Sequence, residues 1–182
     1  MNWSDDLAAC AAIVERGDPL RFRTAMLAPV AQRGALFALY AFNVEVSRAP
    51  WVTKEALIAE MRLQWWRDVV SEPTPRAHEV AGPFHALIAE AALPLQVIDT
   101  LIAARLHDAY GEAFADEAAF DTYLDDTAGG LMWLAAKACG GSFARSRFDL
   151  ALDQPVIFPC NNGDQRLKRV SLDIKGIKTR GR

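Results

Sequence analysis

The chain has 182 residues, of which 52% are hydrophobic and 24% charged, and its formal net charge is −3. This composition is typical of one folded domain and gives no general reason to expect nucleic-acid binding. The three cysteines, Cys10, Cys139 and Cys160, are far apart and form no C-x-x-C pair, so neither a disulfide framework nor a zinc site is indicated. The first ten residues carry acids where a signal peptide needs positive charge, and we therefore expect a cytoplasmic protein, with peripheral membrane contact left open.

Charge and periodicity divide the chain near Gly141. Residues 1–142 carry 11 Lys/Arg and 19 Asp/Glu, whereas residues 143–182 carry nine Lys/Arg and four Asp/Glu. The second segment loses the helical pattern and contains two prolines and an Asn-Asn-Gly turn sequence. We therefore expect a helical domain over residues 1–141 and a divergent basic tail over 142–182, either disordered or out of frame. A basic tail is also typical of contact with a membrane surface, but a solvated terminus is the simpler interpretation.

Capping residues and prolines mark the expected helices in chain order. Ser4, Asp18 and Asp116 are expected N-caps, and Thr53 is expected to cap the helix that carries Trp65 and Trp66. The expected helices cover residues 4–17, 18–28, 30–48, 53–71, 83–91 and 94–106, and the last runs from 116 through Gly129-Gly130 to 139. No convincing strand alternation precedes residue 140, so the prediction is an all-α fold of roughly seven helices.

Two pairs of adjacent residues suggest how these helices pack. Gly129-Gly130 costs about 1 kcal/mol per glycine against alanine inside a helix, which indicates a kink or the close approach of a helix or ligand. Trp65 and Trp66 lie about 100° apart on a helix, so they cannot share one face. Core packing is the default for both, and one of them is expected to flank any cavity.

Three segments form a pattern when taken together: LFALYAF at residues 36–42, EMRLQWWRD at 60–68 and YLDDTAGGLMW at 123–133. This combination resembles the squalene/phytoene synthase family. The resemblance implies an isoprenoid-synthase-type helical bundle, apparently truncated, because it covers about residues 7–140 and only the first half of a typical member. Active members condense two prenyl diphosphates head to head, using Mg²⁺ held by two acidic clusters on facing helices.

The first of those acidic clusters is missing here. The resemblance places its two aspartates at Ser47 and Trp51, neither of which offers a carboxylate, while Arg48 adds positive charge and Glu45 is the one acid left. The second cluster lies beyond the resembling region. Asp149 and Asp153 have D-x-x-x-D spacing but lie outside it, and we expect them to be surface acids.

The form FNVEV at residues 42–46 resembles a narrower branch of the family, the complex I assembly factor 6 type and its bacterial relatives. This implies a diverged, non-catalytic protein with an assembly or isoprenoid/lipid-binding role and no cofactor. Two alternatives stay open: a Mg²⁺-dependent prenyltransferase, and a fragment without activity. Because half a bundle leaves apolar helix faces uncovered, we expect self-association or a protein partner, with a prenyl diphosphate or lipid as the ligand and no nucleic acid.

The resemblance and the residue types together give a set of candidate site residues. The candidates for a ligand cavity are Tyr40, Asn43, Glu45, Trp66, Tyr123, Asp126, Gly129 and Gly130. Arg48 and Arg62 are candidates for binding phosphate, and no catalytic residue or metal ligand is assigned. The three histidines, His78, His85 and His107, have no metal-binding spacing and are expected to be structural or exposed, and Arg105 with Asp108 is expected to form a structural ion pair.

Overall fold

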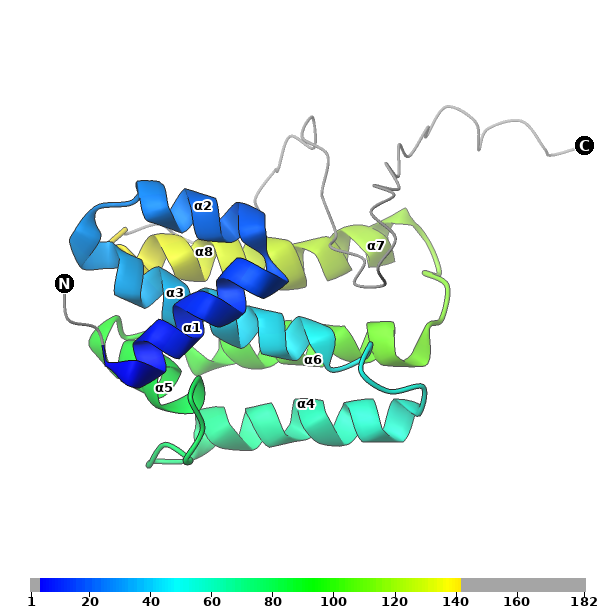
Figure 1. Cartoon of the computed structure of the whole chain (residues 1–182). Coiled ribbons are helices and arrows are strands. Elements are labelled where there is room, and N and C mark those ends of the chain that lie inside the picture. The colour runs from blue at the N-terminus through cyan, green and yellow to red at the C-terminus, as the bar shows by residue number, and fades with distance from the viewer. Residues whose placement is uncertain (1–3, 142–182) are drawn as a thin grey trace, which may run out of the picture. The chain divides into compact units, whose positions relative to one another are not determined.

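The computed structural model describes residues 4–141, and every regular element among them is a helix (Figure 1). The elements are α1 (Asp5–Gly17), α2 (Pro19–Leu27), α3 (Val30–Arg48), α4 (Ala56–Ser71), α5 (Ala81–Glu90), α6 (Leu95–Tyr110), α7 (Glu117–Leu124), the π-helical turn η1 (Asp125–Gly129) and α8 (Gly130–Ala138). In this part of the chain, no helix combines the length and apolar character needed to cross a bilayer.

Three of the four expected N-caps are confirmed. The side chains of Ser4, Asp18 and Asp116 each accept a hydrogen bond from the backbone N–H three residues later, at 3.3, 3.0 and 2.8 Å. The prediction for Thr53 is wrong, because α4 begins only at Ala56. The Thr53 hydroxyl instead accepts a hydrogen bond from the Glu55 N–H at 3.1 Å, so it stabilises the turn that precedes the helix.

Helix α3 lies at the centre of the described bundle (Figure 1). It packs against α1 and α2 on one side and against α5 and α8 on others, while α4 packs mainly against α6. Nine of its residues are buried: Leu36, Phe37, Ala38, Leu39, Ala41, Phe42, Asn43, Val44 and Val46. A helix that is apolar almost all round is expected at the core of a bundle.

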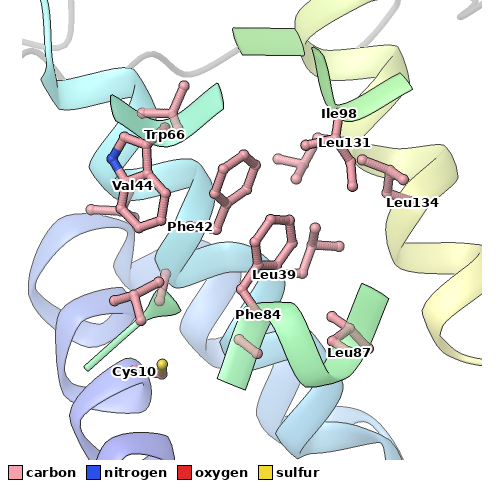
Figure 2. Packing of buried hydrophobic residues seen from close by; sticks show 14 of the residues in the cluster. Cys10, Leu39, Phe42, Val44, Trp66, Phe84, Leu87, Ile98, Leu131 and Leu134 are labelled. Carbon is pink, nitrogen blue, oxygen red and sulfur yellow. The ribbon is translucent and has the colours of Figure 1, made fainter. Parts of the chain in front are cut away.

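Aromatic rings join α3, α4 and α5. Phe42 stacks on Phe84 with the ring centroids 4.0 Å apart, and Trp66 meets Phe42 edge-on at 5.4 Å (Figure 2). Trp66 is 4% exposed, whereas Trp65 is half-buried and packs against His78. Trp66 is therefore the core member of the tryptophan pair.

Helices α7 and α8 form one continuous helical run interrupted by the π-helical turn η1. Inside it, the buried Thr127 hydroxyl donates to the carbonyl oxygen of Tyr123 at 2.7 Å. A Cβ atom at Gly129 would lie 2.9 Å from Oδ1 of Asp125, so a larger residue there would require the Asp125 side chain to move. The irregularity expected at Gly129-Gly130 is thus a local change of helical pitch, a feature that is frequent at functional sites.

Replacing Gly17 with alanine is expected to lower the free energy of unfolding by about 1–3 kcal/mol. A Cβ atom at Gly17 would lie 2.6 Å from Cγ1 of Val44, a buried and stiff β-branched residue on α3. Urea denaturation measures the loss. The control is Gly82→Ala in α5, where the nearest atom is 3.8 Å away and no loss is expected.

The double variant Gly17→Ala/Val44→Ala tests the cause of that loss. Removing the Val44 methyl groups opens the space that the new Cβ needs, so the two substitutions should be less damaging together than the sum of their separate effects. Strict additivity, or a Gly17→Ala variant as stable as the parent, would contradict this packing.

Candidate functional site

The candidate residues on α3 point in different directions. Tyr40 lies half-buried beneath the Arg21 guanidinium, 5.9 Å from its ring centroid, and burial raises the pKa of Tyr40. Asn43 is 6% exposed, and within residues 4–141 its Oδ1 has no hydrogen-bond partner. Glu45 pairs with Arg48 at 3.7 Å. Residues two positions apart in the sequence are separated by about 200° around a helix, so Asn43 and Glu45 face opposite sides of α3.

Ser47 and Trp51, at which the resemblance led us to expect aspartates, differ from each other in both chemistry and place. Ser47 lies on α3, and its hydroxyl donates to the carbonyl oxygen of Val44 at 3.1 Å. Trp51 lies beyond the end of α3 and is 75% exposed. Neither side chain supplies the carboxylate oxygen that Mg²⁺ prefers.

The candidates on α4 separate into an exposed residue and a core residue. Arg62 is exposed, as is Arg48 at the end of α3, so both guanidinium groups are accessible to an anion. Trp66, four residues after Arg62, packs in the core against Phe42. Of the candidate cavity residues, Trp66 therefore has a place in the hydrophobic core of the bundle.

Tyr123 belongs to a polar cluster that joins the end of α6 to the end of α7. Its hydroxyl donates to the Asp108 carboxylate, whose oxygens lie 2.8 and 2.9 Å away, and accepts from Nη1 of Arg105 at 3.0 Å. Arg105 and Asp108 also form the expected ion pair at 3.2 Å, with side chains only 12% and 16% exposed. The pairing of Arg105 with Asp108 was predicted, whereas the part played by Tyr123 was missed, because residues 15 apart in the sequence give no local signal.

One donor of this cluster has no acceptor among the described residues, and the surroundings of the cluster change the pKa of Tyr123. Nε of Arg105 is buried and has no hydrogen-bond partner among the described residues. Burial raises the pKa of the Tyr123 phenol to about 12, and the nearby Asp108 carboxylate acts in the same direction. The phenol therefore stays protonated and donates to Asp108 throughout the physiological range.

The remaining candidates lie on η1 and at the start of α8. Asp126 is half-buried, and Gly129 and Gly130 are both buried. Because α8 packs against α3 and η1 packs against α6, these small residues lie inside the bundle. Their position fits close helix packing as well as contact with a ligand.

A cleft among the described residues lies away from these candidates. It has a volume of about 230 Å³ and lies between α4 and α6, where it is lined by Arg67, Val70, Ser71, Leu95, Gln96, Asp99 and Ile102. Arg67 binds Asp99 through two hydrogen bonds of 2.7 and 3.0 Å, so its charge is paired. None of the residues expected to line a cavity contributes to this cleft.

The histidines with hydrogen bonds have structural partners. Nδ1 of His78 accepts from the Val80 N–H at 3.1 Å, and Nε2 of His85 lies 2.9 Å from the carbonyl oxygen of Glu72. His107 stacks on Phe114, with the ring centroids 3.9 Å apart. Between residues 4 and 141, no three His, Cys, Asp or Glu side chains come close enough to form a metal site.

Replacing Asn43 with leucine is expected to raise the free energy of unfolding by about 1–2 kcal/mol. The buried Oδ1 has no partner in the described residues, so an apolar side chain of similar size removes a desolvation cost. Thermal or urea unfolding of the full chain checks this. Asn43→Asp is the opposite case, because burying a carboxylate costs more free energy than burying an amide, so this variant should be less stable than the parent. A loss of stability in Asn43→Leu would contradict this, because it would show that the amide makes a stabilising hydrogen bond.

Stability is expected to fall as the pH rises from 10 to 12. The folded state favours the neutral phenol of Tyr123, whose pKa is raised from 10.0 to about 12, so its contribution is complete below pH 10 and is lost as the pH passes 12. The buried Cys10 thiol, whose pKa is raised from 9.0 to about 12, adds a fall that begins near pH 9. Urea unfolding across this range measures the slope, which should be shallower in Tyr123→Phe; an unchanged slope would contradict the assignment.

Comparison with characterised proteins gives relatives from one group. The chain is 23% identical to human NADH dehydrogenase (ubiquinone) complex I, assembly factor 6, over 76% of this chain and 42% of the relative. The bovine protein of the same name is 24% identical over 72% of this chain and 40% of its own length. The Drosophila melanogaster homolog is 42% identical over a shorter stretch, 35% of this chain and 19% of the relative. This chain thus spans about two fifths of the human and bovine proteins, and no solved structure matches it.

The family assignment agrees with the sequence motifs and with the helical architecture. The squalene/phytoene synthase profile matches residues 14–154, which is most of the chain and extends past Gly141. The motifs at residues 36–42, 60–68 and 123–133 all lie inside that match. The all-α bundle is of the isoprenoid-synthase type, as predicted. The chain belongs to the squalene/phytoene synthase family.

Proposed function

We propose that this chain is a non-catalytic member of its family that takes part in the assembly of a complex I-type NADH dehydrogenase. The observation that carries the proposal is the pair of residues at the first metal-binding position, Ser47 and Trp51. The assembly role comes from the human, fly and bovine relatives, which are named as assembly factors of complex I.

The chemistry of the active family members explains why these two residues matter. Ionising a prenyl diphosphate builds negative charge on the leaving group, and Mg²⁺ held by carboxylates neutralises it. The Ser47 hydroxyl donates to a backbone carbonyl, and Trp51 is an exposed indole. Glu45, the one acid nearby on α3, is paired with Arg48 at 3.7 Å. This set of groups is poorly suited to bind Mg²⁺ and a diphosphate together.

The proposal includes a lipid or isoprenoid as ligand, bound without a metal or other cofactor. Two features support a ligand between α3 and α8, because both are frequent where a ligand completes a site: the Oδ1 of Asn43, which has no hydrogen-bond partner among residues 4–141, and the π-helical turn before Gly130. Arg48 and Arg62, both exposed, are the side chains available to an anionic head group. We place the protein in the cytoplasm, at the surface of the membrane that holds the complex.

Deletion of the gene in its own host tests the assembly role. We expect the amount of assembled NADH dehydrogenase, measured by native gel electrophoresis with an in-gel NADH stain, to fall to a small fraction of the parental level. Expression of the full chain should restore it, and so should a chain carrying Glu90→Gln at an exposed position of α5. A deletion strain with the full amount of assembled complex would refute the proposal.

The second candidate is a Mg²⁺-dependent prenyltransferase that joins two prenyl diphosphates head to head. Family membership over residues 14–154 favours it. It requires Mg²⁺ ligands that residues 4–141 do not bring together at Ser47 and Trp51. Incubating the full chain with farnesyl diphosphate, Mg²⁺ and NADPH, followed by mass spectrometry of the extracted lipids, separates the candidates. We expect no C30 product, and its formation would make the enzyme function the better account.

A further inference from the structure

Both leucines of α2 point away from the bundle, which is unusual for a surface helix. Leu20 and Leu27 are 55% and 86% exposed. The inward face of α2 carries Phe22, whose ring centroid lies 5.4 Å from that of Phe37 on α3. Leu20, Arg23 and Leu27 recur at i, i+3 and i+7, the spacing of residues that share one face of a helix. Helical geometry therefore places an arginine between two leucines on the outward face.

The corner between α2 and α3 extends this apolar face. Met26 and Val30 are 41% and 51% exposed. The main neighbours of α2 among the described elements are α1 and α3, and α2 lies at the edge of the bundle (Figure 1). We call the exposed apolar residues of this face the α2 surface, and they are Leu20, Met26, Leu27 and Val30. Clustered apolar side chains that remain exposed are typical of an interaction surface.

The charge beside the α2 surface is positive. Residues 19–44 contain three arginines, Arg21, Arg23 and Arg33, and no Asp or Glu. Arg23 is exposed between the two leucines. The Nε of Arg33 donates to the carbonyl oxygen of Ala28 at 2.9 Å, so this guanidinium is held next to the residue that follows Leu27. Both cations are thus placed among the apolar side chains by contacts and by helical spacing.

The acids closest to α2 in the sequence do not cancel this charge. The Asp18 carboxylate accepts from the Arg21 N–H at 3.0 Å and pairs with the Arg21 side chain. In the last turn of α1, Glu15 is followed by Arg16, so these two charges offset each other. The acids in the first turn of α1 lie at the other end of that helix, where Asp6 approaches α5. The α2 surface therefore combines apolar side chains with a net positive charge.

We propose that the α2 surface binds the surface of an anionic phospholipid bilayer. Its apolar side chains enter the boundary between head groups and acyl chains, and Arg23 and Arg33 meet the lipid phosphates. The helix then lies in the plane of the interface, with its leucines toward the lipid. The inference rests on the membrane location in the proposed function, and it names the face that provides the contact.

Other occupants fit this charge less well. A symmetric second copy would bring the same arginines face to face, and like charges at an interface repel. Residues 143–182 would add positive charge, because they carry nine Lys/Arg and four Asp/Glu. Arg48, proposed to meet the head group of a bound ligand, lies at the opposite end of α3 from Val30 and is not part of this surface.

Sedimentation of the purified full chain with lipid vesicles tests the proposal. The vesicles consist of phosphatidylcholine alone or of an equal mixture of phosphatidylcholine and phosphatidylglycerol. We expect the mixed vesicles to bind the chain at least about tenfold more strongly, because each cation near an anionic membrane contributes about fivefold. Equal binding to the two kinds of vesicle, or no binding to the mixed vesicles, would overturn the proposal.

Two matched double variants locate the contact. Leu20→Gln/Leu27→Gln changes the outward face of α2 and should weaken binding to the mixed vesicles at least about tenfold without altering stability. The control, Leu57→Gln/Met61→Gln, changes residues of α4 that are 67% and 65% exposed and should leave binding unchanged. Binding that survives Leu20→Gln/Leu27→Gln, or that both pairs weaken equally, would assign the contact to another part of the chain and refute the α2 surface.

A matched pair of single variants tests the charge. Arg23→Gln should weaken binding to the mixed vesicles about fivefold, because it removes a cation from the contact. Arg62→Gln removes an exposed cation from α4 and should have no such effect. An equal loss in the two variants would show that net charge alone drives binding and would contradict the proposed contact.

The competing occupants and the assembly role are tested separately. Light scattering reports self-association, and calorimetry with a helical peptide of leucine and glutamate reports an acidic protein partner. Either one, if abolished by Leu20→Gln/Leu27→Gln while vesicle binding is not, would replace the membrane as occupant. The gene deletion reports on assembly alone: vesicle binding through the α2 surface, with a fully assembled complex in the deletion strain, would keep the surface and remove the function. Loss of the complex in that strain, without vesicle binding, would do the reverse.

Discussion

Replacing Phe84 with alanine is expected to lower the free energy of unfolding by about 3–5 kcal/mol. The Phe84 ring is completely buried on α5 and stacks on Phe42 of α3 at 4.0 Å, with Trp66 of α4 against the other side of the pair (Figure 2). Its loss removes a large apolar side chain and leaves a cavity where three helices meet. Urea denaturation followed by circular dichroism measures the change.

Two further substitutions show whether this effect comes from packing. Phe84→Leu keeps much of the volume and should lose clearly less stability than Phe84→Ala. Leu27→Ala changes a side chain that is 86% exposed and should alter stability by less than about 0.5 kcal/mol. A Phe84→Ala variant within 1 kcal/mol of the parent would mean that the aromatic cluster is not part of the cooperative core.

The second large effect is expected at Arg105, where methionine should cost about 3 kcal/mol of stability. The substitution leaves the Asp108 carboxylate, only 16% exposed, without its cation, although Tyr123 still donates to it. Loss of the Arg105–Tyr123 hydrogen bond also weakens the contact between the ends of α6 and α7. Thermal unfolding together with hydrogen exchange of the α7 amides measures both consequences.

A second substitution, at Asp108, distinguishes an ion pair from simple packing. Arg105→Met/Asp108→Leu removes both charges, and it should recover most of the stability that Arg105→Met alone loses. As a control, Arg62→Met removes an exposed cation from α4 and should change stability by less than about 0.5 kcal/mol. A double variant no more stable than Arg105→Met would show that the charges of Arg105 and Asp108 are not energetically coupled.

Most of the helical architecture could be predicted, because its signals are local. Asp18-Pro19 and Asp116 predicted their helix starts, and their side chains make the expected capping bonds. Thr53 failed as a cap, because a turn that also favours Thr lies between it and α4. The apolar spacing of Leu57, Met61 and Trp65 gave no warning that the first two would be exposed, since periodicity reports a face and not what covers it.

The candidate site was harder to predict, because it depends on contacts between distant helices. Ser47 and Trp51 could be picked out by comparison with a motif, since residue type alone carries that argument. The joint role of Arg105, Asp108 and Tyr123 depends on how α6 meets α7. That Oδ1 of Asn43 has no partner among the described residues depends on all the elements packed around α3. The opposite directions of Asn43 and Glu45 follow from helical geometry, and the list of cavity residues could have been divided on that ground.

Isothermal titration of farnesyl diphosphate into the purified full chain, with and without Mg²⁺, tests most directly the proposal that this chain lacks metal-dependent chemistry. Ser47 and Trp51 provide no carboxylate for the metal, so we predict that any binding heat is the same in the presence of Mg²⁺ as in its absence. Arg48→Gln/Arg62→Gln should weaken whatever metal-independent binding occurs, since it removes the two exposed cations proposed to meet the diphosphate. Binding that appears only when Mg²⁺ is added would contradict the non-catalytic account and would favour the prenyltransferase.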